Sequence, residues 1–125
     1  MSPARFFTNS IAAVTLAAAV LSSAPASAAN FDGNWSVVIV TQRGPCDSAY
    51  RYGLSIRNGA VFYEGSAPVN VSGRVNGNGG VSVRVWAGSQ SATGSGRLAH
   101  GAGRGTWRGV SSSGACSGYW TAQQR

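Results

Sequence analysis

The 125-residue chain contains no lysine, one histidine and only three acidic residues. The acids Asp32, Asp47 and Glu64 are scattered, so no two have the spacing of a general acid and its partner base. No G-x-S-x-G segment is present, although that segment carries the nucleophile of many serine hydrolases. His100 lies in the glycine-rich segment AHGAG, which favours an exposed turn. We therefore predict no catalytic residue and a protein that is not an enzyme, although a Ser–His–Asp set assembled from distant segments stays open.

Cysteine is also scarce, with Cys46 and Cys116 the only two in the chain. They form no C-x-x-C motif and a single histidine accompanies them, so a disulfide is favoured over a metal site. We predict a Cys46–Cys116 disulfide, no metal and no cofactor. Because disulfides form in oxidising compartments, the pair favours an exported protein.

The first residues have the pattern of a targeting segment. Arg5 supplies the positive charge, residues 11–21 form an apolar run, and residues 26–28 match an A-x-A cleavage signature. The run is shorter than the roughly 20 residues that a membrane-spanning helix needs, so a transmembrane anchor is the weaker alternative. We predict a signal peptide over residues 1–28, a single domain over residues 29–125, and a periplasmic or extracellular location.

The charge is one-sided, because all ten basic residues are arginine. After cleavage, nine arginines face three acids, which leaves a net charge of +6. Such an excess favours anionic neighbours such as lipopolysaccharide, acidic polysaccharide or nucleic acid, and it serves equally to keep a protein in solution.

Helical periodicity is missing throughout the predicted domain. Short segments rich in valine, threonine, tyrosine and tryptophan alternate with glycine-rich turns, which is typical of strands. Asn58-Gly59 is the clearest hairpin signal, because a type I′ turn needs positive φ at both central residues. Eight strands are predicted, over residues 34–42, 49–57, 60–64, 69–76, 81–86, 89–99, 104–110 and 115–122.

An antiparallel meander of eight short strands exposes two edges unless its first and last strands pair. An even number of strands permits that closure. Both cysteines would then lie at one rim, and their disulfide would fasten the seam. The predicted fold class is all-β: an eight-stranded antiparallel up-and-down meander, closed or nearly closed into a small barrel, and we expect a monomer.

Arginine recurs on the strand face opposite the valines, so the barrel is predicted to be charged outside and apolar inside. This pattern, with several strands of only five to seven residues, argues against an outer-membrane barrel, which needs an apolar outer band and strands of about nine to eleven residues. The candidate anion-binding residues of the outer face are Arg84, Arg97, Arg104 and Arg108.

The inward face supplies Trp35, Tyr52 and Trp107 as candidate ligand-binding residues. Trp120 is the fourth candidate, and alternation places Trp120 and Tyr119 on opposite faces. Small eight-stranded barrels are either filled by side chains or hold one small ligand. Inward glycines either leave interior volume unfilled or permit sharp bending, so a cavity and a packed core both stay open. These glycines include Gly94, Gly96 and Gly105.

Gly33-Asn34-Trp35, at the start of the first strand, resembles the G-x-W of small calyx-forming barrels, the lipocalin and avidin superfamily. In those proteins the tryptophan plugs one end of the barrel and an arginine near the last strand packs across it. The resemblance implies that role for Arg125 or, less favoured, Arg108. The predicted mature chain, from FDGNW to CSGYWTAQQR, also resembles small exported proteins of Gram-negative proteobacteria, a likeness that implies no activity.

These observations favour an exported binding or envelope-associated protein whose ligand is a small, partly apolar molecule or an anionic glycan. One alternative is a surface that binds polyanions through arginine and aromatic groups. Another is a structural or inhibitory protein that contacts its partner through the rim segments RGPCDSAY and SSSGAC. Nucleic acid is the less favoured polyanion, and no membrane span is expected after cleavage.

Overall fold

A computed structural model describes residues 31–125 of the chain. The predicted signal peptide lies outside the described residues. Each predicted strand is present, with its ends displaced by at most two residues. The eight strands are β1 (Gly33–Arg43), β2 (Ala49–Arg57), β3 (Ala60–Tyr63), β4 (Asn70–Val75), β5 (Gly80–Ala87), β6 (Gln90–Ala99), β7 (Ala102–Ser111) and β8 (Gly114–Gln124).

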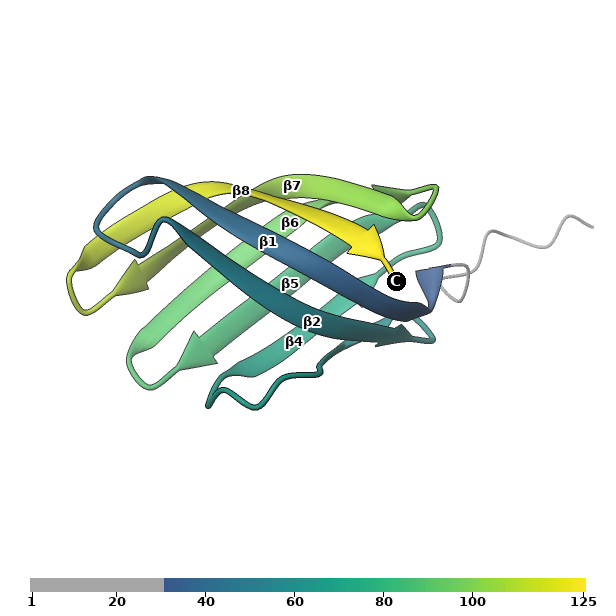
Figure 1. Ribbon diagram of the computed structural model, residues 1–125, viewed down its shortest axis with the longest axis horizontal. Coiled ribbons are helices and arrows are strands. Elements are labelled where there is room, and N and C mark those ends of the chain that lie inside the picture. Colours follow the sequence, from purple (N-terminus) through teal and green to yellow (C-terminus); the bar gives the residue numbers. More distant parts are fainter. Residues whose placement is uncertain (1–30) are drawn as a thin grey trace, which may run out of the picture.

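The strands form one closed antiparallel barrel, in which each strand pairs with its neighbours in the chain and β1 also pairs with β8 (Figure 1). The predicted fold class is confirmed, and closure is complete. Asn58 and Gly59 have φ values of 51° and 79°, as the predicted hairpin turn between β2 and β3 requires. The start of β1 and the C-terminus lie at the same end of the barrel (Figure 1).

Six of the eight strands have at least eight residues, whereas β3 and β4 have four and six. Of the three strands predicted with five to seven residues, β5 and β7 are longer, with eight and ten. β7 is longer because His100 and Gly101, both at positive φ, make the whole turn between β6 and β7. The outer face carries arginine, serine and threonine where a membrane barrel has an apolar band. Within residues 31–125, no helix is long and apolar enough to cross a membrane.

One end of the barrel, where β1 begins, is plugged by buried side chains. Trp35 is only 2% exposed, and its indole N–H donates to the carbonyl oxygen of Phe31 at 2.9 Å. Ile56, Val75 and Leu98 are buried around it. We call this the closed end.

Hydrogen bonds from three segments secure the closed end. The Asp32 carboxylate accepts from the backbone N–H groups of Asn58, at 2.7 Å, and Gly59, at 3.4 Å. The Gln124 side chain donates to the Asp32 carbonyl oxygen at 2.9 Å. The segment that precedes β1 is thereby tied to the β2–β3 turn and to the end of β8.

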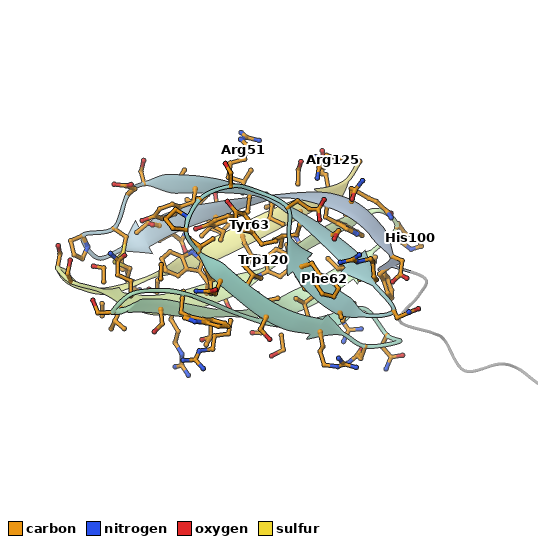
Figure 2. All side chains as sticks on the ribbon, turned by 90° about the horizontal axis from the view of Figure 1, so that it is seen from below. Arg51, Phe62, Tyr63, His100, Trp120 and Arg125 are labelled. Carbon is orange, nitrogen blue, oxygen red and sulfur yellow. A yellow bond between two sulfur atoms is a disulfide. The ribbon has the colours of Figure 1, made fainter. Side chains whose placement is uncertain are left out.

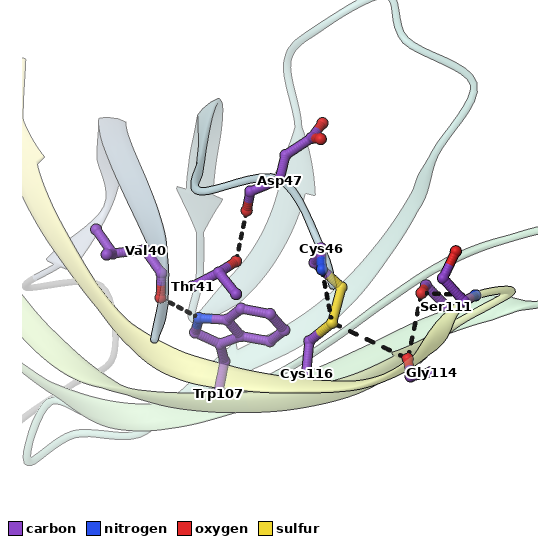
Figure 3. Close-up of a disulfide and its surroundings, with 9 residues drawn as sticks. Val40, Thr41, Cys46, Asp47, Trp107, Ser111, Gly114 and Cys116 are labelled. Carbon is purple, nitrogen blue, oxygen red and sulfur yellow. Dashed lines mark hydrogen bonds between the residues drawn. A yellow bond between two sulfur atoms is a disulfide. The ribbon is translucent and has the colours of Figure 1, made fainter. Parts of the chain in front are cut away.

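The opposite end carries the predicted disulfide, and we call it the open end. Cys46, in the loop after β1, is bonded to Cys116, near the start of β8, with 6.1 Å between the two Cα atoms (Figure 3). The prediction that the disulfide fastens the β1–β8 seam at one rim is confirmed. Inward residues here, such as Tyr50, Val69 and Val85, are only partly buried.

Candidate ligand-binding site

The barrel is hollow, with a cavity of about 280 Å³ between its walls. The wall formed by β1 to β5 is mainly aliphatic, and its central side chains include Ile39, Leu54, Val71 and Val83. The facing wall, formed by β6 to β8, includes two tryptophan rings, glycine backbone and small side chains such as Ala92 and Ala122. Because the closed end is plugged and the residues at the other end are partly exposed, the cavity reaches solvent at the open end.

All four predicted ligand-binding residues line this cavity. Trp35 forms its floor at the closed end, Tyr52 lies on the β2 side, and Trp107 and Trp120 project from β7 and β8. Figure 2 shows Trp120 between the walls of the barrel, whereas the labelled Arg51 points outward. Alternation along the strands predicted the inward side for Trp35, Tyr52 and Trp107, and for Trp120 it predicted only the side opposite Tyr119.

The inward glycines of β6 and β7 make room for the Trp120 ring. A Cβ atom placed on Gly96 would lie 2.6 Å from Cζ2 of Trp120, and one on Gly105 would lie equally close to that ring. The indole N–H donates to the carbonyl oxygen of Ser95 at 3.2 Å, which holds the ring against this wall. The volume that these glycines leave is thus filled by Trp120, and the cavity lies on the other side of the ring.

Trp107 uses a glycine of the neighbouring strand in the same way. Gly118 is its direct partner on β8, and a Cβ atom there would lie 3.0 Å from the indole nitrogen. The indole therefore passes over β8 and donates its N–H to the carbonyl oxygen of Val40 on β1, at 2.9 Å (Figure 3). One side chain thus links three strands across the seam that closes the barrel.

The polar atoms of the three buried indoles are all satisfied by backbone carbonyl groups. Trp35 donates to Phe31, Trp107 to Val40 and Trp120 to Ser95. Buried donors left without partners would cost free energy or recruit water. Because these donors have protein partners, the rings contribute apolar surface to the cavity.

A tyrosine cluster, Tyr50, Tyr52 and Tyr63, lies on the inner face toward the open end. The rings of Tyr50 and Tyr52 are stacked with centroids 6.4 Å apart, and Tyr63 meets Tyr52 edge to face at 5.9 Å. Burial, with smaller contributions from Tyr50 and Tyr63, raises the pKa of Tyr52 above its ordinary value. The Tyr52 hydroxyl therefore stays protonated, and able to donate a hydrogen bond, throughout the neutral range.

The barrel wall beside this cluster has the fewest paired residues of any strand pair. The β3–β4 ladder has only two paired positions, Ala60 with Arg74 and Val61 with Gly73, although β4 extends to Asn70. Beyond them the chain leaves the sheet in the loop of residues 64–69, and the Tyr63 hydroxyl accepts the backbone N–H of Ala67 at 3.2 Å. One side of the open end is therefore bordered by the loop of residues 64–69 and by the tyrosine cluster.

The four predicted anion-binding arginines are exposed on the outer face, as expected from alternation. Arg97 and Arg104 are direct partners across β6 and β7, and Arg108 follows on β7. Arg84, on β5, lies two strands from Arg108, with Thr93 of β6 paired to both, and its guanidinium lies 5.3 Å from the centroid of the Trp86 ring. The structure thus places all four on the same part of the outer face.

A shallow groove on the outer face adds residues that sequence reasoning missed. It is bordered by Arg108 of β7 and Arg43 of β1, with Ser117 of β8 between them. Ser117 pairs with Arg108 on one side and with Arg43 on the other. Arg43 ends β1, far from Arg108 in the sequence, so only the closed register reveals that the two are neighbours.

The acids and the histidine are placed apart in the structure. Asp32 binds the β2–β3 turn, Glu64 accepts a hydrogen bond from Ser55 at 3.0 Å, and Asp47 lies in the β1–β2 loop. His100 is exposed at the β6–β7 turn. Among the described residues, no three His, Cys, Asp or Glu side chains lie close enough to hold a metal ion.

Of the two arginines to which the G-x-W resemblance points, Arg125 lies beside Trp35. Its guanidinium donates to the Trp35 carbonyl oxygen at 3.4 Å, and it is labelled at the end of the chain in Figure 2. Arg108 is exposed on the outer face, near the open end. No protein-family model, curated protein or solved structure matches the chain.

Proposed function

We propose that the protein is an exported, non-enzymatic binding protein that holds a small, partly apolar molecule inside its barrel. The observation that carries this proposal is the cavity of about 280 Å³, plugged at the closed end and accessible at the open end. Concave apolar sites with a few polar groups are where proteins bind small molecules. A barrel with no such role gains more stability by filling its interior, because voids cost packing energy.

The size of the cavity sets the size of the ligand. An apolar cavity of about 150 Å³ holds one benzene molecule. The cavity here has nearly twice that volume, so its occupant has an apolar body of roughly ten to twelve non-hydrogen atoms.

The distribution of polar groups sets the character of the ligand. The indole donors are occupied, so the deep part of the cavity favours hydrocarbon or an aromatic ring. Tyr50 and Tyr52 line the cavity and bring hydroxyl groups to its open half. The ligand that fits best is therefore amphipathic, with one hydroxyl, carbonyl or carboxylate group directed toward the open end.

Export and the absence of catalysis are part of the same proposal. The disulfide is compatible with an oxidising location, and the signal-peptide pattern of residues 1–28 favours export. Asp32 and Glu64 take part in hydrogen bonds that secure the barrel, away from the apolar cavity, which supports binding over chemistry.

Titration with primary alcohols tests the proposal through tryptophan fluorescence. We expect saturable, one-to-one binding whose affinity rises about fourfold per methylene group from hexanol and levels off near decanol, where the cavity is full. Val83→Phe, which fills the cavity, should weaken decanol binding at least tenfold. Val38→Phe adds the same volume to the outer face and should change the affinity less than twofold.

Two results would contradict the proposal. One is the absence of a saturable signal with every alcohol in the series. The other is an equal loss of affinity in the two variants, because that would place the bound alcohol outside the cavity.

A further inference from the structure

A strip of arginine and hydroxyl side chains runs along the outer face of β6, β7 and β8 and reaches the end of β1. At one end are Arg97 and Arg104, which are direct partners across β6 and β7. At the other end are Arg108 and Arg43, which border the shallow groove. The outward positions between them carry hydroxyl groups and one exposed aromatic ring, Tyr119, which is 41% exposed. The arginine strip comprises Arg97, Arg104, Arg108 and Arg43, with Ser95, Thr106, Ser117 and Tyr119 between them.

No acidic side chain from the same strands neutralises the strip. Residues 65–125 contain neither aspartate nor glutamate. The three acids of the chain lie at the β2–β3 turn, beside Ser55 and in the β1–β2 loop. Arg97 and Arg104 are direct partners across β6 and β7, a pairing of like charges that is unfavourable in a sheet. The Arg97 guanidinium donates to the carbonyl oxygen of Asn78 in the β4–β5 turn at 3.3 Å, on the side away from Arg104.

The spacing of the strip suits a polymer that carries acidic groups at intervals. Arg104 and Arg108 are four residues apart on one strand, about 13 Å. Arg108 and Arg43 are two strands apart, about 10 Å, with Ser117 between them. Guanidinium groups bind carboxylate or sulfate in a forked geometry, and the intervening hydroxyl groups match the hydroxyl groups of sugars.

The aromatic content of the strip separates the possible polymers. Proteins that bind single-stranded nucleic acid stack successive bases on a series of aromatic side chains. The strip carries one such ring, Tyr119, in its middle. One ring among hydroxyl groups is better matched to a sugar ring within an acidic chain.

We propose that this arginine strip is a second binding site, for an acidic polysaccharide that lies along β7 on the outside of the barrel. The site is independent of the cavity, because alternation directs the side chains of β6, β7 and β8 away from the interior, and a register shift between Thr41 and Arg43 pairs Arg43 with the outward Ser117. The protein would thereby be held at an anionic glycan while its cavity remains open.

The test compares the binding of heparin, polygalacturonate and single-stranded DNA over a range of sodium chloride concentrations. We expect both polysaccharides to bind more tightly than DNA, with affinities that fall at least tenfold between 50 and 200 mM salt, roughly the behaviour of multi-contact ionic complexes. Arg104→Gln/Arg108→Gln should weaken polysaccharide binding at least tenfold and lower the salt slope by about two.

The matched control is Arg51→Gln/Arg74→Gln, which removes two charges from the outer face of β2 and β4. It should weaken binding less than threefold. An equal loss in both variants would show attraction by net charge alone and would overturn the site. Failure of both polysaccharides to bind at 50 mM salt, or tighter binding of DNA, would overturn the assignment of the partner, and neither result bears on alcohol binding in the cavity.

Discussion

Gly94 and Gly105 face the interior on adjacent strands, yet they have different tasks. Gly105 lies directly beneath the Trp120 ring, where a Cβ atom would come within 2.6 Å of Cε2 and Cζ2 and would also meet the Ser95 carbonyl oxygen. A Cβ atom on Gly94 would meet Trp120 Nε1 at 3.5 Å, an ordinary contact. The shape of one wall of the cavity therefore depends on Gly105 and much less on Gly94.

Replacement of these two glycines by alanine separates the two tasks. Gly105→Ala should lower the free energy of unfolding by about 1 to 3 kcal/mol, the usual cost of overpacking a core. Gly94→Ala should leave it unchanged or raise it by up to about 1 kcal/mol, because alanine restricts the unfolded chain. Urea unfolding followed by tryptophan fluorescence measures both, and equal destabilisation by the two substitutions would refute the assigned position of the Trp120 ring.

For single residues, the sequence predicted which face of the sheet a side chain occupies better than it predicted which groups that side chain contacts. Alternation along the strands was sufficient to assign Trp107 to the inside and Arg104 and Arg108 to the outside, and to place Trp120 and Tyr119 on opposite faces. It could not show that Trp120 fills the space left by Gly96 and Gly105, because that requires a rotamer that crosses from one strand to the next. The same limit left the choice between cavity and packed core open.

Among the elements, the β1–β8 pair decides whether the sheet is a barrel. Backbone pairing, the indole of Trp107 and the disulfide all join this seam, and Cys46 and Cys116 are 70 residues apart in the sequence. A crosslink that closes a loop of that length stabilises the folded state by about 4 kcal/mol in the chain-entropy model. A domain of about 95 residues has few other sources of stability of this size.

Removal of the disulfide should therefore weaken the barrel strongly. Cys46→Ser/Cys116→Ser should lose about 4 kcal/mol in the free energy of unfolding, measured with urea at neutral pH. The reduced native protein should match the double variant, and a reductant should have no effect on the variant itself. A loss below about 1 kcal/mol would mean that pairing and packing hold the seam without the crosslink.

The elements also show where sequence reasoning about strands ends. The Asn58-Gly59 turn, the alternating segments and the two cysteines together predicted eight strands and their closure. The turn and the alternation are local signals, and closure depends only on the number of strands being even. The short β3–β4 ladder was not predictable, since it depends on how the loop of residues 64–69 leaves the sheet. The neighbourhood of Arg43 and Arg108 likewise follows only from the closed register.

For the molecule as a whole, closure creates two separate surfaces from one alternating pattern. The inner surface is apolar, with tyrosine hydroxyl groups toward the open end, and the outer surface is cationic along β7. A small amphipathic molecule matches the first, and an acidic polysaccharide matches the second. The two proposals depend on different residues and can fail independently.

Methyl NMR of the protein saturated with decanol tests most directly whether a ligand enters the barrel. We predict nuclear Overhauser effects between the alkyl chain of decanol and the methyl groups of Leu54, Val71 and Val83, all of which line the cavity. Val38, which points outward from β1, should show none. If decanol at saturation contacts only outer methyl groups, or none at all, the barrel interior is not the binding site and the proposed function is wrong.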